Sequence, residues 1–133
     1  MKRLITLAMF LPVLAFAGKA EREMMKNEVT PAVKESEAAF SKACGCNLKI
    51  TIADSIKSMD DMAQAKRVAE DVKSNAAGYC TDADSKKAIC KMKSLEIGKT
   101  TETKFSMSGS RGVATTDGTS YPTFSMMTQE LDK

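Results

Sequence analysis

The sequence predicts a two-layer α+β domain in which two main helices pack on one face of a mostly antiparallel sheet of about four or five strands. Three observations predict it. Apolar residues recur at helical spacing in the first part of the chain, short alternating segments rich in Thr, Ser and Gly follow the last cysteine, and all four cysteines lie within residues 44–90. The expected order is α-β-α-β-β-β, with or without one more strand, in a single disulfide-stabilised domain over residues 30–128.

Residues 1–17 have the features of a secretory signal peptide. Lys2 and Arg3 precede an almost wholly apolar run, and small residues indicate cleavage near Ala17. The run is too short for a membrane span, and because the first cysteine is Cys44, we expect no lipid anchor. The sequence therefore predicts a periplasmic protein, or a secreted one if the cell has a single membrane.

Composition excludes several classes of function. The chain has 20 basic and 17 acidic residues, and loss of the signal peptide removes two of the basic ones, which leaves a net charge of +1. Nucleic acid is therefore not an expected partner. The chain has no histidine, which removes the Ser-His-Asp and Cys-His mechanisms. We expect no catalytic residues, no cofactor and no enzyme activity.

The first helix is predicted to begin at residue 30 and end near Cys44. Residues 18–29 are mostly charged, and we expect a flexible or frayed segment there. Thr30 is a suitable cap and Pro31 suits the first helical position. A narrow apolar stripe follows at steps of three and four residues: Val29, Ala32, Val33, Ser36, Phe40 and Ala43.

A strand over residues 47–53 and a second helix come next. Leu48, Ile50 and Ile52 alternate with polar residues, the pattern of a strand with one buried face. Ser58 and Asp61 then form a capping box for a helix that ends near Gly78. The charged side of this helix is typical of a solvated face.

The remainder is predicted to be antiparallel strands with a short capped turn before them. Asp82 and Asp84 lie in that turn, where capping explains them better than calcium binding. The predicted strands cover residues 92–97, 102–108, 112–116 and 119–128. Asp117-Gly118 favours a hairpin between the last two, Pro122 places the last strand at an edge, and residues 129–133 are expected to be a tail.

Element order predicts that the four cysteines meet at one end of the domain. Both helices run back along the sheet, so they end where the first two strands begin. We favour Cys44–Cys80 with Cys46–Cys90, and the crossed pairing Cys44–Cys90 with Cys46–Cys80 stays open. A Cys44–Cys46 bond would close a small, strained ring, and the C-x-C spacing does not favour zinc.

The functional prediction is a small non-enzymatic binding module of the inhibitor, immunity or accessory type, acting on a protein partner. Its candidate binding residues are Ser108, Ser110 and Arg111, in a Gly-rich connection between two predicted strands. Ser108-Gly109-Ser110-Arg111 resembles the Ser-Gly-Ala-Arg/Lys segment of periplasmic inhibitors of animal-type lysozyme. The aromatic-lysine-glycine segment of those inhibitors is missing downstream and Gly112 replaces an aromatic residue, so we do not assign the chain to that family.

The alternative function is copper or thiol-redox handling by the cysteines and methionines. Thioethers and thiolates together suit Cu(I). Eight methionines follow the signal peptide, but several fall where core residues belong, which favours core packing. We therefore expect no metal site.

Overall fold

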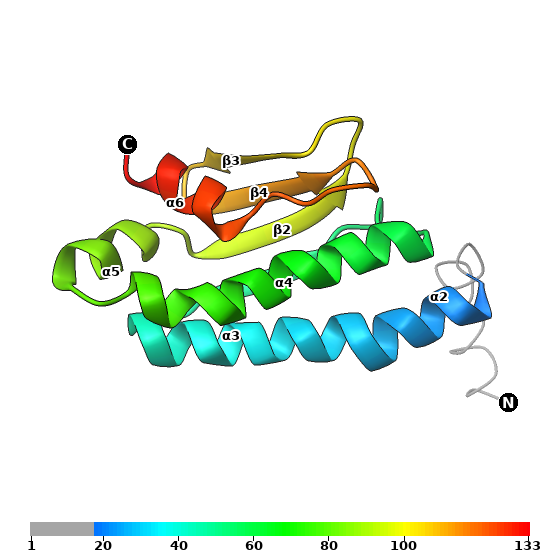
Figure 1. Cartoon of the computed structure of the whole chain (residues 1–133), viewed down its shortest axis with the longest axis horizontal. Helices are drawn as coiled ribbons and strands as arrows, with labels where there is room; N and C mark the ends of the chain where they lie inside the picture. The colour runs from blue at the N-terminus through cyan, green and yellow to red at the C-terminus, as the bar shows by residue number, and fades with distance from the viewer. Residues whose placement is uncertain (1–17) are drawn as a thin grey trace, which may run out of the picture.

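The structure, a computed structural model, describes residues 18–133, so the predicted signal peptide lies outside the described residues. Its helical segments are α2 (Lys19–Met24), the π-helix η1 (Met25–Val29), α3 (Thr30–Cys44), α4 (Met59–Tyr79), α5 (Ala83–Ile89) and α6 (Phe124–Leu131). Its strands are β1 (Lys49–Ile52), β2 (Ser94–Lys99), β3 (Lys104–Ser108) and β4 (Arg111–Thr116) (Figure 1). The predicted α+β class is confirmed.

The four strands form one mixed sheet in the order β1-β2-β4-β3. β1 pairs in parallel with β2, β2 pairs in parallel with β4, and only β3 and β4 are antiparallel. The prediction of a mostly antiparallel sheet is therefore wrong. The chain leaves β2, forms β3 at the far edge and returns as β4 between them, so β4 runs in the same direction as β2.

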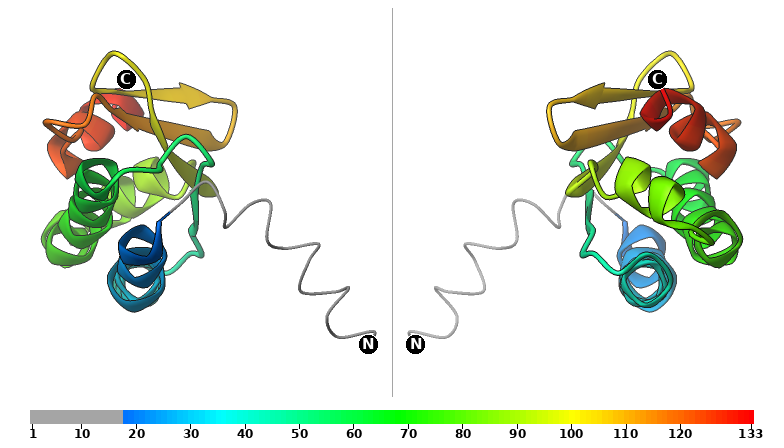
Figure 2. Two further views of the ribbon diagram at one scale, coloured as in Figure 1. Left: turned by 90° about the vertical axis from the view of Figure 1, so that its right-hand side faces the viewer. Right: turned by 90° about the vertical axis from the view of Figure 1, so that its left-hand side faces the viewer.

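The helices lie to one side of this sheet (Figure 2). α4 contacts β2 and β4, whereas α3 packs mainly against α4 and reaches the sheet at β1. The core between the two layers is made by fully buried side chains from both: Phe40, Val68, Val72, Ile89, Met92, Leu95, Ile97 and Met127. Burial alternates along β1 and β3, so the opposite face of the sheet is left to solvent.

The first helical run starts at Lys19 rather than at residue 30. Val29 is fully buried, and Met24 and Met25 pack against the core. Thr30 has α-helical backbone angles and makes no capping bond, so the prediction that it caps a helix is wrong. The run passes Pro31, which lacks a backbone donor, directly after the π-helical turn.

The segment after β4 also differs from the prediction, because residues 119–128 form a loop and a helix instead of a strand. The Asp117 carboxylate accepts hydrogen bonds from the backbone N–H of Thr119 and Ser120, at 2.9 and 3.1 Å, and these bonds direct the chain away from a hairpin. Thr123 then caps α6. Pro122 is buried in the loop, so the prediction that it lies in an edge strand is wrong.

The end of the chain belongs to the fold. Asp71 on α4 accepts a 2.6 Å hydrogen bond from the backbone N–H of Phe124, the first residue of α6. Phe124, Met127 and Leu131 are buried at helical spacing. The expected tail over residues 129–133 thus includes the last turn of α6.

The predicted capping box at the start of α4 is confirmed, and it is part of a larger contact. The Ser58 hydroxyl accepts the Asp61 N–H at 3.1 Å, and the Asp61 carboxylate also pairs with Lys99 on β2 at 3.1 Å. Burial raises the pKa of Asp61, but the hydrogen bonds from Lys99 and Ser58 lower it by more, so this pKa lies below its usual value.

This depressed pKa predicts a pH-dependent contribution to stability. The contribution is fully present above the pKa of an unfolded Asp, about 3.9, and is lost as the pH falls through the lower folded pKa. Asp61→Asn is expected to reduce the free energy of unfolding by about 2 kcal/mol at neutral pH, and by less in acid, in urea titrations. Asp60→Asn, at an exposed neighbour, is the control. If Asp61→Asn lowered the free energy of unfolding equally at neutral pH and in acid, the pKa of Asp61 would not be depressed in the folded protein.

Candidate functional site

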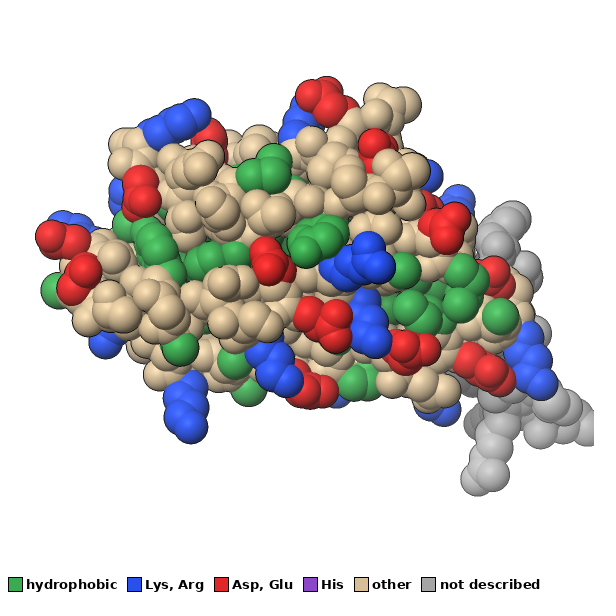
Figure 3. All heavy atoms as spheres, viewed as in Figure 1, with side chains coloured by type: hydrophobic (Ala, Val, Ile, Leu, Met, Phe, Trp, Pro, Cys, Tyr) green, Lys and Arg blue, Asp and Glu red, His purple; other side chains and the backbone are tan. Residues whose placement is uncertain are grey.

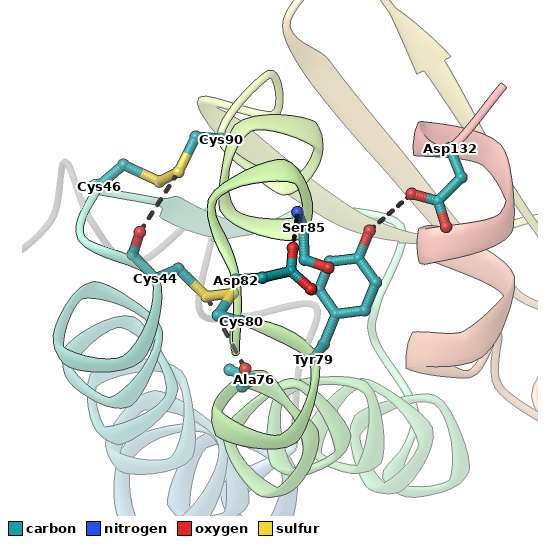
Figure 4. The surroundings of a disulfide bond; sticks show 9 residues. All are labelled: Cys44, Cys46, Ala76, Tyr79, Cys80, Asp82, Ser85, Cys90 and Asp132. Carbon is teal, nitrogen blue, oxygen red and sulfur yellow. Dashed lines mark hydrogen bonds between the residues drawn. A yellow bond between two sulfur atoms is a disulfide. The ribbon is translucent and has the colours of Figure 1, made fainter.

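The two disulfides lie at one end of the domain, which we call the disulfide pole (Figure 4). Cys44 ends α3 and bonds to Cys80 just after α4, with 5.2 Å between their Cα atoms. Cys46 precedes β1 and bonds to Cys90 just after α5, with 6.0 Å between Cα atoms. This is the pairing that the order of elements favours. The Cys90 sulfur also contacts the Cys44 carbonyl oxygen at 3.6 Å, which brings the two bonds together.

Polar side chains beside the pole have structural roles. The Tyr79 hydroxyl donates to Asp132 at 2.6 Å and joins the ends of α4 and α6 (Figure 4). Burial first, and the Asp132 carboxylate second, raise the pKa of Tyr79 to about 12, so this hydroxyl keeps its proton at neutral pH. Asp82 accepts the Ser85 N–H at 2.8 Å and caps α5, which lowers the pKa of Asp82.

The predicted binding residues meet at a tight hairpin. Ser108 ends β3 and pairs with Arg111, which begins β4, so only Gly109 and Ser110 form the turn. Gly109 has φ +64°, a conformation that favours glycine. Ser108, Ser110 and Arg111 are all exposed. The Gly-rich connection predicted between these two strands is therefore a two-residue turn.

This hairpin lies at the same end of the sheet as the disulfides. The backbone N–H of Lys93 donates to the Ser110 carbonyl at 2.7 Å, and Lys93 directly precedes β2. The Lys49 N–H in turn donates to the Lys93 carbonyl at 3.1 Å. A chain of backbone hydrogen bonds therefore links the hairpin turn to the start of β1, three residues from Cys46.

The strand register places mostly polar side chains in rows on the solvent side of the sheet. Lys49, Ser94, Arg111 and Ser108 are successive partners in the first row. Thr51, Glu96, Val113 and Ser106 form the second row. Lys104 lies two residues before Ser106 on the same side of β3. We call these nine residues the outer face; each is exposed or partly exposed.

The outer face is rich in hydrogen-bond donors. Arg111 pairs with Glu96 at 3.6 Å, and their side chains are 56% and 37% exposed. Lys49 and Lys104 form no ion pair within residues 18–133. Four hydroxyls have no intramolecular partner in the same range, namely those of Thr51, Ser94, Ser106 and Ser108. The face can thus offer several free donors to a ligand.

Sequence reasoning proposed Ser108, Ser110 and Arg111 as candidate binding residues and did not group Lys49 and Glu96 with them. These two lie far from the hairpin in sequence and join it only because β1, β2 and β4 are parallel and start in one row. An antiparallel arrangement would have separated them. The available signal was the alternation of Lys49 and Thr51 with buried residues. This alternation shows which side of the strand faces solvent, but it does not show which strands lie beside it.

A groove of about 240 Å³ lies elsewhere, between η1, α3 and α4. Two ion pairs cross it, from Lys66 to Glu28 at 3.0 Å and from Lys73 to Glu35 at 2.7 Å. Acidic and basic side chains are intermixed over these helices (Figure 3). Since both lysines are already paired, the groove is a charged seam between two helices.

The structure offers no free thiolate for copper or redox chemistry, because all four cysteines are in disulfides. Within residues 18–133, no group of three or more His, Cys, Asp or Glu side chains is arranged to hold a metal ion. Met62, Met92 and Met127 are buried in the core, whereas Met59 and Met126 are exposed. None of the helices in this range has the length and apolar character needed to cross a bilayer.

No protein-family model matches the chain, and no curated protein or solved structure is significantly similar to it. The candidate site therefore rests on geometry alone. Of the surfaces described above, the outer face combines exposure, unpaired donors and a backbone held by disulfides.

Proposed function

We propose that the protein is an exported, non-enzymatic binding module that acts on a protein partner as an inhibitor, immunity factor or accessory subunit. The outer face is the observation that carries this proposal. It presents Arg111 and free hydroxyls on a regular sheet, and none of its residues is buried. Arginine is enriched at the centres of protein interfaces because its planar group makes several hydrogen bonds at once.

Two features support export. Disulfides form and persist in oxidising compartments, and this small domain contains two of them. The predicted signal peptide adds a second, independent argument from the sequence.

The disulfides also support a binding role, because they limit motion at the surface. Cys46–Cys90 joins the starts of β1 and β2, and the Lys93–Ser110 hydrogen bond joins β2 to the hairpin. A surface that is already ordered loses less conformational entropy on binding.

The test is capture of a partner from an extract of the exported fraction of the source cells. Arg111→Ala is expected to reduce the affinity for the captured protein by about fivefold or more, as truncation of an interface arginine commonly does. Lys34→Ala on the exposed side of α3 is the matched control, since it removes one charge outside the outer face. Equal capture by wild type and Arg111→Ala would remove the hairpin from the proposed interface.

A further inference from the structure

We propose that the outer face binds an acidic segment of its partner, an inference that rests on the proposed function and specifies the partner's chemistry. Lys49 and Arg111 stand in one row with Ser94 between them, and Lys104 lies at the opposite corner of the sheet. Neighbouring strands are about 4.8 Å apart, so the backbones of Lys49 and Arg111 are separated by roughly 10 Å. Both side chains are long enough to reach carboxylates on one extended segment.

The charge balance of the outer face favours an acidic ligand. It carries three cations and one carboxylate, Glu96. The remaining surface of residues 18–133 therefore has no net positive charge, because the whole range carries only +1. On the helical side, Lys66 and Lys73 are each paired with a glutamate across the helix seam, whereas Lys26 and Lys34 form no ion pair within residues 18–133.

The hydroxyls of the outer face fit the same ligand. Ser94 lies between Lys49 and Arg111, and Ser108 follows Arg111 in the row. A carboxylate accepts hydrogen bonds at both oxygens, so it can bind a cation and a neighbouring hydroxyl together. Glu96 satisfies Arg111 only in part, because their contact is long and both groups remain solvent-accessible.

Other occupants fit less well. In a symmetric dimer the same patch meets itself, and the cations of one outer face would face those of the other. Binding to anionic lipid headgroups usually needs a cluster of about four to eight basic residues. The outer face has three, and Lys104 lies at the opposite corner of the sheet from Lys49. An acidic protein segment needs only a few well-placed cations.

The experiment uses the disulfide-bonded protein and a defined probe, a labelled peptide of alternating Glu and Ser residues. Backbone amide NMR shifts locate the peptide, and fluorescence anisotropy measures its affinity. We expect shifts on the outer-face residues of β1, β2 and β4, and an affinity that falls severalfold between about 50 and about 300 mM salt. A peptide of alternating Lys and Ser should not bind.

Charge reversal provides the matched variants. Lys49→Glu with Arg111→Glu should weaken binding of the acidic peptide by about tenfold or more. Lys26→Glu with Lys34→Glu makes the same change in net charge on exposed helical residues, and should leave the affinity within about twofold. Both double variants are first shown to retain their disulfides and thermal unfolding curves.

Each outcome decides the inference. Lack of binding by the acidic peptide, shifts elsewhere, or equal loss in both double variants would overturn it. Dimers that form with rising concentration and are lost on reversal of Lys49 and Arg111 would overturn it in favour of a second copy of the chain. Binding to vesicles with anionic lipid that is lost on the same reversal would overturn it in favour of a membrane surface. If a captured partner binds the Lys49→Glu, Arg111→Glu variant with unchanged affinity, the binding-module proposal stands and the acidic-partner inference is wrong.

Discussion

Replacing Cys44 and Cys80 together with alanine is expected to lower the free energy of unfolding by about 4 kcal/mol. The two residues are 36 positions apart, so their bond removes much of the freedom of the unfolded chain. Both side chains are buried, so the variant also loses packing where α3 and α4 end. Urea titration of the purified double variant, compared with wild type, measures the loss.

Two controls separate the effect of the cross-link from that of the substitutions. Wild-type protein treated with a strong reductant loses the bonds while keeping its cysteines, and should lose at least the same stability. Cys46 and Cys90 are 44 positions apart, so replacing that pair should cost a similar amount in the entropic account. A loss below about 1 kcal/mol for Cys44 and Cys80 would show that the two helix ends are held together without their bond.

The local patterns predicted β1 and α4 well, although they missed the helical run before residue 30. β1 and α4 follow directly from alternation, helical spacing and the Ser58 capping box, because each signal lies within a few residues of the element that it defines. Element order predicted that the cysteines meet at one end and left two pairings open, of which the structure has the favoured one. Once helix, strand and helix are placed, the ends that carry Cys44 and Cys80 are on the same side.

The prediction for the C-terminal part was wrong where a local pattern was compatible with two structures. Asp117-Gly118 suits a hairpin, but the Asp117 side chain instead binds Thr119 and Ser120 and turns the chain toward α6. The helical spacing of Phe124, Met127 and Leu131 was present in the sequence but overlapped an expected strand. The Asp71 contact that stabilises the start of α6 comes from 53 residues earlier, which no local pattern reveals.

The site was predictable only in part for a similar reason. Arg111 and its two serines are neighbours in sequence, so a turn signal was sufficient to group them. Lys49 lies in the same row because β1 pairs in parallel with β2, and β2 pairs in parallel with β4. The second pairing exists only because β4 lies beside β2 in the sheet. Pairing of distant strands is decided by the packing of the whole core, and alternation within a strand carries no information about its neighbour.

Gly112→Ala is expected to destabilise the fold by about 2 kcal/mol, because this position has no room for a side chain. Gly112 lies on the inner side of β4, and a Cβ there would be 2.5 Å from the Met92 sulfur and 3.0 Å from the Phe105 ring. Met92 is fully buried, so its displacement would disturb the core. Urea titration measures the change in unfolding free energy.

Gly78→Ala should change the free energy of unfolding in the opposite direction. A Cβ at Gly78 meets no atom within 4 Å, and the residue lies within α4 without a positive φ. Alanine there reduces the freedom of the unfolded chain and should stabilise the protein by about 0.5 to 1 kcal/mol. A stabilised or neutral Gly112→Ala would mean that β4 does not approach Met92 this closely. Because β4 reaches Met92 by pairing beside β2, such a result would also challenge the parallel register that places Arg111 in one row with Lys49.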